Sequence, residues 1–153
     1  TGVFCTPEHY ARLAEISRIN GVKEASGDIS LVSRTRHLCG DALNIWSGND
    51  DQTLPILALG AKGVISVTSN IVPQVMATLC AAALSGDFFT ARALHEAYAG
   101  LFDALFLEVN PIPVKAAMQM LGWDSGRLRL PLCPMTEENA ARMQQCLESL
   151  QLL

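Results

Sequence analysis

The sequence predicts an α/β protein in which a parallel sheet with its helices is followed by an all-helical region. Up to about residue 86 one pattern recurs: an amphipathic helix, a glycine or asparagine stop, four or five apolar residues and a polar turn. It appears three times at intervals of about twenty residues, which is typical of βα units. A barrel and a doubly wound sheet both fit. No GxGxxG or Walker sequence follows a predicted strand, which disfavours the nucleotide-binding forms.

The first unit begins with a helix and leads to a short strand that carries a lysine. Thr6 is a predicted N-cap, Pro7 occupies the first turn, and apolar residues at helical spacing continue to a stop near Asn20. A short apolar strand then ends at Lys23. Ser26-Gly27-Asp28 predicts a tight turn, with Asp28 as the cap of a helix that begins near Ile29.

The second and third units repeat this order. The helix after Asp28 is expected to end at Gly40, and the next strand covers Leu43 to Trp46. A polar turn from Ser47 to Asp51 leads to a helix over Gln52 to Leu59. The third strand is predicted over Gly63 to Val67.

Helices account for the rest of the chain. Pro73 opens one helix, and Asp87 caps a long one that we expect to run to about Glu108. Pro113 lies near the start of the next, and Thr136 caps a last helix that ends near Leu150. An extended strap from Arg127 to Pro134 joins these last two. We therefore expect two domains, 1–86 with the sheet and 87–153 with helices alone.

Composition and charge exclude several classes of function. The net charge of −4, a pI near 5.3 and the lack of a basic cluster argue against nucleic-acid binding. No apolar run approaches a membrane span of about 20 residues and no signal pattern is present, so a cytoplasmic protein is expected. The five cysteines form no CxxC pair and are expected to be reduced and buried. The histidines are His9, His37 and His95; they lie far apart, and we expect no metal site.

The apolar content is high for one domain of 153 residues. It reaches 50%, with a mean hydropathy of +0.25. Such a surplus indicates surface that is hidden in an assembly or against another part of a larger protein.

Lys23 is the candidate catalytic residue, and two interpretations of it are open. A lysine at the carboxyl end of a buried strand loses hydration, and burial disfavours the ammonium form. The neutral amine is a nucleophile that forms a Schiff base with a keto acid. In the alternative, the lysine extends to solvent or pairs with Glu24.

Four segments together resemble one enzyme family. They are GVKEASGD from Gly21, SGND from Ser47, GVISVTSN from Gly63 and NPIPVK from Asn110. Their order and spacing are similar to those of the dihydrodipicolinate synthase and N-acetylneuraminate lyase family of class I aldolases, and most similar to its dihydrodipicolinate synthase branch. That family has a (β/α)8 TIM barrel followed by a helical domain.

The resemblance also implies that the chain is a part of such a barrel. Three strands cannot close an eight-stranded barrel, so the chain corresponds to the last three strands and the C-terminal helical domain. Thr1-Gly2 resembles the last two residues of the family's RTG segment, as though the chain were cut after the arginine.

The family implies roles for particular residues. Lys23 carries the Schiff base, while Gly48 and the main-chain carbonyl of Ile65 contribute to substrate binding. Independently of the family, Glu24 is expected either to support the site by hydrogen bonding, rather than by acid–base catalysis, or to be a plain strand-end carboxylate. Asn49 departs from the family, which often has an acidic residue there. No dissociable cofactor is implied, because the lysine itself is the electron sink.

Other family groups fall outside this chain. The proton-shuttling tyrosine, a pair of hydroxyl residues and the RTG arginine have no counterpart, and Tyr10 and Tyr98 lie on predicted helices that do not replace the first. Asn110 and Lys115 are expected to fix loop geometry and a helix start.

The function that the resemblance implies is condensation of pyruvate with L-aspartate 4-semialdehyde in lysine and diaminopimelate biosynthesis. The implied partners are thus a small keto acid and an aldehyde. Members of the family are commonly oligomers, which implies a homo-oligomer here too. One alternative is a sister aldolase, acting on N-acetylneuraminate or a keto-deoxy sugar acid. Another is a non-catalytic fragment that serves as a packing or oligomerisation module.

Overall fold

The computed structural model describes residues 3–153, so the resemblance at Thr1-Gly2 lies outside the described residues. The chain forms two compact units. One comprises the residues up to Ser66 together with Thr78–Arg92, and the other comprises Val67–Ala77 and Ala93–Leu153.

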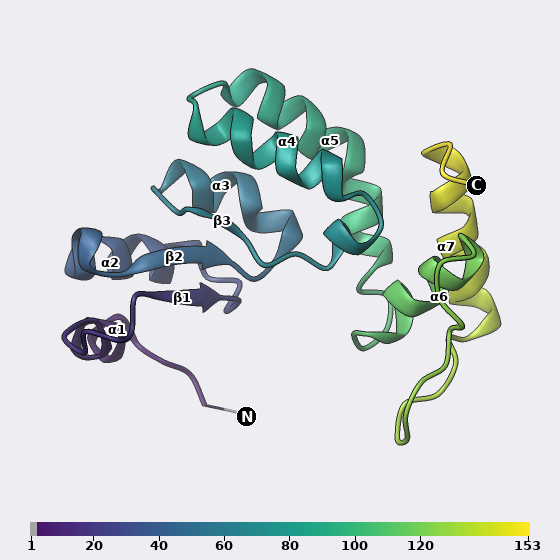
Figure 1. Cartoon of the computed structure of the whole chain (residues 1–153), viewed down its shortest axis with the longest axis horizontal. Coiled ribbons are helices and arrows are strands. Elements are labelled where there is room, and N and C mark those ends of the chain that lie inside the picture. Colours follow the sequence, from purple (N-terminus) through teal and green to yellow (C-terminus); the bar gives the residue numbers. More distant parts are fainter. Residues whose placement is uncertain (1–2) are drawn as a thin grey trace. The chain divides into compact units, whose positions relative to one another are not determined.

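The first unit is built on a parallel three-stranded sheet (Figure 1). The strands lie in the order β1 (Gly21–Glu24), β2 (Asn44–Ser47) and β3 (Gly63–Val64). Helices alternate with them: α1 (Pro7–Ala14), α2 (Ile29–Cys39) and α3 (Thr53–Ala58), with short 3-10 turns at η1 (Gly40–Ala42) and η2 (Asp50–Gln52). This confirms the predicted α/β class with three parallel strands.

The third strand is shorter than predicted. β3 ends at Val64 rather than at Val67. One further ladder bond follows, from the Ile65 N–H to the Ser47 carbonyl at 2.8 Å, and the chain then bends into η3 (Thr68–Asn70). A turn that uses its own local hydrogen bonds cannot also continue the parallel ladder, which is why the strand stops there.

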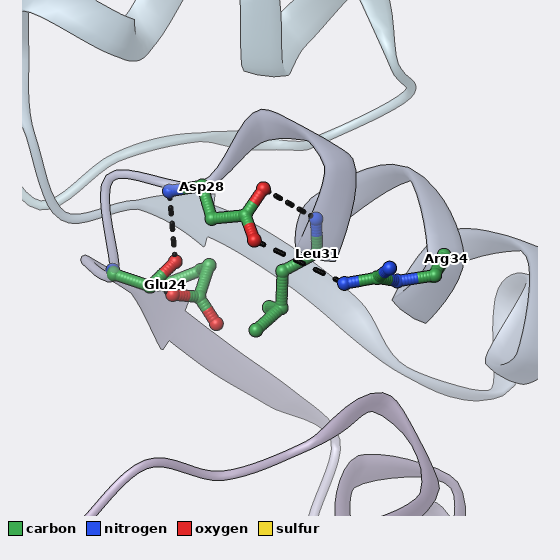
Figure 2. Close-up of polar contacts among 5 residues, drawn as sticks. Glu24, Asp28, Leu31 and Arg34 are labelled. Carbon is green, nitrogen blue, oxygen red and sulfur yellow. Dashed lines mark hydrogen bonds and ion pairs between the residues drawn. The ribbon is translucent and has the colours of Figure 1, made fainter.

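The helix starts follow the predicted caps. The Thr6 hydroxyl accepts the His9 N–H, and the His9 imidazole accepts the Thr6 N–H at 3.1 Å, which makes a reciprocal capping box. The Asp28 carboxylate accepts the Leu31 N–H at 3.0 Å and lies 3.9 Å from the exposed Arg34 (Figure 2). The backbone bond caps α2, whereas the exposed ion pair adds little stability.

The sheet has one covered face and one open face within this unit. Glu24, Ile45 and Ser47 are buried on the face that α1, α2 and α3 cover. Side chains alternate along a strand, so Lys23 and Trp46 point the other way. Lys23 is exposed and Trp46 half-buried. The predicted lysine therefore lies at the open face of a three-stranded sheet.

The second unit is helical and has its own core. Leu101, Leu105, Ala117, Met143 and Leu147 are fully buried there. The helices that contribute to it are α4 (Pro73–Leu84), α5 (Phe88–Ala104), α6 (Ile112–Met120) and α7 (Glu137–Ser149), of which α4 and α5 also have residues in the first unit.

The helix α5 is shorter than predicted, while its start agrees with the sequence. The Asp87 carboxylate accepts the Thr90 N–H at 3.0 Å, as expected of a cap. The helix ends at Ala104 instead of near Glu108. The Glu108 carboxylate is instead bonded to Thr136 and Asn139 at the start of α7.

The expectation of buried cysteines is wrong for most of them. All five are free thiols, but only Cys39 is buried and Cys133 is exposed. Cys133 belongs to the strap from Arg127 to Pro134, which contains neither helix nor strand and has no buried residue.

Candidate active site

The three predicted site residues lie on the same face, at the carboxyl ends of adjacent strands. Lys23 pairs with Trp46, and Trp46 pairs with Gly63. Gly48 lies two residues after Trp46, and Ile65 lies two residues after Gly63. Because side chains alternate along a strand, both lie on the same face as Lys23. Ladder bonds continue that far, because the Gly48 N–H donates to the Glu24 carbonyl at 2.7 Å. In parallel α/β sheets this edge is where ligands bind.

Gly48 makes room for the lysine side chain. A Cβ atom at position 48 would lie 3.0 Å from Lys23 Cε, 2.6 Å from Ala25 Cβ and 3.1 Å from the Glu24 carbonyl oxygen. The aliphatic part of Lys23 therefore passes directly against Gly48, toward the carboxyl edge of the sheet. Any side chain at position 48 would force the lysine or the strand to move.

Ile65 contributes its main chain at the edge strand. Its N–H is bound to Ser47, and its side chain is 50% exposed on the open face. A large apolar side chain that is half exposed at a sheet edge is available to a further part of the protein or to a ligand.

Glu24 holds the end of β1 from the opposite face. Its carboxylate accepts the Tyr10 hydroxyl at 2.9 Å and the Ser26 N–H at 2.7 Å, while its carbonyl accepts the Gly48 N–H. Burial, followed by the bond to Glu24 and its charge, raises the pKa of Tyr10. Glu24 thus joins α1, the β1–α2 turn and β2, and it does so on the side away from the Lys23 amine.

The turn after β2 is tied to the turn after β1. The Gln52 amide donates to the Gly27 carbonyl at 3.0 Å, and the Ser47 hydroxyl donates to the Asn49 carbonyl at 2.7 Å. Asp50 is buried beside these groups, and the pKa of the Cys80 thiol is raised by burial and then by that carboxylate. The rim around Gly48 is therefore organised by the chain's own hydrogen bonds.

Lys115 has a structural role in the second unit. Its amine lies 3.0 Å from Asp124 Oδ1, and Asp124 also accepts the Gly126 N–H at 2.7 Å. The Lys115 bond, and then the Gly126 bond, lower the pKa of Asp124. The pair joins α6 to the turn that follows it, and Asn110 precedes a cis peptide to Pro111 at the start of the same helix.

Trp46 lies beside the candidate site, and the sequence interpretation gave it no place there. The strand pattern placed it among apolar residues without a role, yet it is the Cα partner of Lys23. Gly21 and Gly63 border its indole from the neighbouring strands, but only the strand register brings them beside it, so the sequence carried no signal.

The described residues offer neither a metal cluster nor a membrane-spanning helix. In residues 3–153 no three histidine, cysteine, aspartate or glutamate side chains gather closely enough to hold a metal ion. In the same part of the chain no helix is both long and apolar enough to cross a bilayer.

The fold and the site define a class: an α/β protein with a lysine at the carboxyl edge of a parallel sheet, beside a glycine that makes room for it. The sequence profile of the dihydrodipicolinate synthetase family matches residues 1–150. The chain therefore belongs to the dihydrodipicolinate synthetase family.

Individual relatives give the same result. The chain is 49% identical over 148 residues to a 4-hydroxy-tetrahydrodipicolinate synthase of Methanothrix thermoacetophila, covering 96% of this chain and 50% of the relative. It is 47% identical over 153 residues to the enzyme of that name from Thermodesulfovibrio yellowstonii, covering 100% of this chain and 53% of the relative. The chain spans about half the length of the curated relatives it matches.

Solved structures agree in fold. A dihydrodipicolinate synthase from Thermotoga maritima superposes with a TM-score of 0.96 at 43% identity, covering 100% of this chain and 53% of that one. The chloride-inhibited enzyme from Acinetobacter baumannii, crystallised with pyruvate, gives a TM-score of 0.97 at 36% identity, covering 100% and 53%.

Proposed function

We propose that this chain supplies the Schiff-base lysine of a pyruvate-dependent lyase of the dihydrodipicolinate synthase type. The reaction is condensation of pyruvate with L-aspartate 4-semialdehyde in lysine and diaminopimelate biosynthesis. The observation that carries the proposal is the position of Lys23 on the open face, against Gly48 and at the carboxyl edge of the sheet. The names of the relatives, and the pyruvate bound to one of them, support it.

The chemistry follows from a primary amine and a ketone. The neutral Lys23 nitrogen attacks the ketone carbon, a C–N bond forms, and the carbonyl oxygen leaves as water to give an iminium. Loss of a methyl proton gives an enamine, whose carbon attacks the aldehyde. The lysine accepts the electrons, so no dissociable cofactor is needed. Groups that move protons and hold the carboxylate come from the rest of the protein.

The proposed architecture is part of a barrel with an appended domain. Residues 1–86 supply three of eight strands, and residues 87–153 supply a C-terminal helical domain. The three parallel strands, the half-length coverage of relatives and the helices α5, α6 and α7 support this arrangement. Small-molecule substrates, homo-oligomeric assembly and a cytoplasmic location belong to the same proposal by analogy with the family.

The test is covalent trapping. The protein is incubated with pyruvate and borohydride, and its intact mass and peptide map are compared with those of the untreated protein. The chain has three lysines, Lys23, Lys62 and Lys115, so Lys62→Arg is a matched control for Lys23→Arg. We expect a reduced pyruvate adduct on Lys23 that is lost only in Lys23→Arg. Absence of the adduct from a polypeptide with a complete barrel would refute the proposal.

Two alternative functions are separated by further measurements. A sister aldolase would form the same adduct, but its enamine would react with a sugar-derived aldehyde rather than with aspartate semialdehyde. A non-catalytic fragment that serves as a packing module would form no adduct as the 153-residue chain alone, and an adduct confined to a longer form of the protein would agree with it. The half-length coverage of the relatives favours that outcome.

A further inference from the structure

The indole of Trp46 lies across all three strands on the open face. A Cβ atom at Gly21 of β1 would overlap Cζ3 of the indole and lie 3.0 Å from Cη2. A Cβ atom at Gly63 of β3 would lie 3.5 Å from Cδ1 and 3.8 Å from Nε1. The benzene ring thus covers Gly21, and the pyrrole edge borders Gly63. Position 21 therefore has to lack a side chain for the indole to occupy this place, whereas Gly63 borders the indole at van der Waals distance.

Lys23 and Trp46 diverge although their Cα atoms are partners. The indole extends over Gly21, which precedes Lys23 by two residues, or about 6.6 Å along the strand. The lysine stem passes against Gly48 in the other direction. The indole therefore lies toward the amino-terminal end of the strands, whereas the lysine side chain runs toward the carboxyl edge.

We propose that Trp46 is a positioning residue whose indole forms the floor beneath Lys23, between Gly21 and Gly63, and holds the amine at the carboxyl edge of the sheet. This inference rests on the proposed Schiff-base role of Lys23. The floor limits the rotamers of the lysine stem, so less ordering is needed when pyruvate arrives.

The same arrangement makes Trp46 a reporter. The chain has two tryptophans, and the other, Trp123, is 57% exposed in the second unit. In a Trp123→Phe background, with any tryptophan outside these 153 residues also replaced by phenylalanine, all indole fluorescence comes from Trp46. Formation of the iminium on Lys23, whose Cα is the partner of the Trp46 Cα, is expected to change that fluorescence, and reduction by borohydride, which converts the iminium to a secondary amine, is expected to change it again.

The experiment compares Trp46→Leu, Trp46→Phe and the control Trp123→Phe, in whichever length of polypeptide forms the Lys23 adduct. The rate of borohydride-trapped adduct is measured over a range of pyruvate concentrations, and folding is checked by urea denaturation. In Trp46→Leu we expect the limiting rate to fall roughly tenfold with a smaller change in half-saturating pyruvate. Trp46→Phe, which keeps an aromatic ring, should retain most of the limiting rate of the unsubstituted protein, and Trp123→Phe should retain all of it.

Two results would overturn the inference while leaving the proposed function intact. One is a Trp46→Leu protein that is trapped as fast as the parent, with Trp46 fluorescence indifferent to pyruvate. The other is a trapping rate that falls equally in Trp46→Leu and Trp46→Phe, with the loss explained by their lowered folding stability alone. Failure of the unsubstituted protein with a complete barrel to form any Lys23 adduct would instead remove the proposed function, and this inference with it.

Discussion

At the scale of single residues, the course of the Lys23 side chain depends on the absence of a side chain at position 48. In Gly48→Ala the new methyl would meet Ala25 Cβ and the Glu24 carbonyl oxygen as well as Lys23 Cε. We expect a loss of about 1–3 kcal/mol in the free energy of unfolding, from overpacking, and slower trapping of pyruvate. Urea denaturation and the borohydride assay measure the two effects.

Gly100 provides the matched control for that substitution. It lies inside α5, and a Cβ atom there would meet nothing within 4 Å. Gly100→Ala should therefore raise the free energy of unfolding by about 0.5–1 kcal/mol. If the two alanine variants had the same stability and the same trapping rate, the close approach at Gly48 would have no consequence.

The raised pKa of Tyr10 makes part of the free energy of unfolding depend on pH in the alkaline range. Burial and the bond to Glu24 raise its pKa, so the folded chain holds this proton more tightly than the unfolded chain does. The contribution is complete below the ordinary tyrosine pKa of about 10 and is lost as the pH rises from there toward the folded value. Tyr98→Phe leaves Tyr10 as the only tyrosine, and its absorbance titration should then shift downward on unfolding.

Removing the same hydroxyl tests the bond itself. Tyr10→Phe should lower the free energy of unfolding by about 1–2 kcal/mol at neutral pH, because the buried Glu24 carboxylate loses a donor. It should also flatten the dependence of stability on pH above about 10. A variant as stable as its parent at both pH values would show that water replaces the hydroxyl.

At the scale of elements, the start of α7 is organised by one carboxylate. Glu108 accepts the Thr136 N–H, the Thr136 hydroxyl and the Asn139 amide, each at 2.9 Å. The Asn139 bond, then the Thr136 backbone bond, lower the pKa of Glu108. Its contribution is therefore present above its ordinary pKa of 4.5 and is lost as the pH falls through the lower folded value.

Glu108→Gln should make the first turn of α7 less protected and remove its sensitivity to acid. Amide hydrogen exchange at Asn139, followed from neutral pH to well below pH 4.5, measures this. Glu138→Gln removes one negative charge from the first turn of α7 itself and should leave the acid sensitivity in place. Equal behaviour of the two variants would show that helix-end charge, and not the Glu108 bonds, sets the effect.

At the scale of the whole molecule, the open face of the sheet is the main consequence of having three strands. It carries the exposed Lys23, the half-buried Trp46 and the half-exposed Ile65. Three strands cannot close into a barrel. A longer polypeptide with the strands that relatives possess should therefore form the Lys23 adduct at least about tenfold faster than the 153 residues alone, because the amine would be oriented and desolvated.

A fluorescent dye that binds apolar surface provides a second measure of the same comparison. The 153-residue chain should bind more dye per mole than the longer form, in proportion to the open apolar face. Equal trapping rates and equal dye binding would mean that the open face is complete by itself.

Features that depend on neighbours a few residues apart could be predicted from the sequence alone. The caps at Thr6, Asp28 and Thr136 accept hydrogen bonds from donors three residues on, so their signals lie within one helical turn. The position of Lys23 at the end of a strand, and the four segments that indicated the family, are local in the same sense.

Features that depend on register and packing were settled only by the folded chain. The Tyr10–Glu24 bond joins residues 14 apart, and the Glu108–Thr136 bonds join residues 28 apart. The place of the Trp46 indole required Gly21 and Gly63 to be brought beside it by two parallel crossovers. Single-chain periodicity contains neither the register nor the rotamers that create such contacts, because both are fixed only when distant elements pack together.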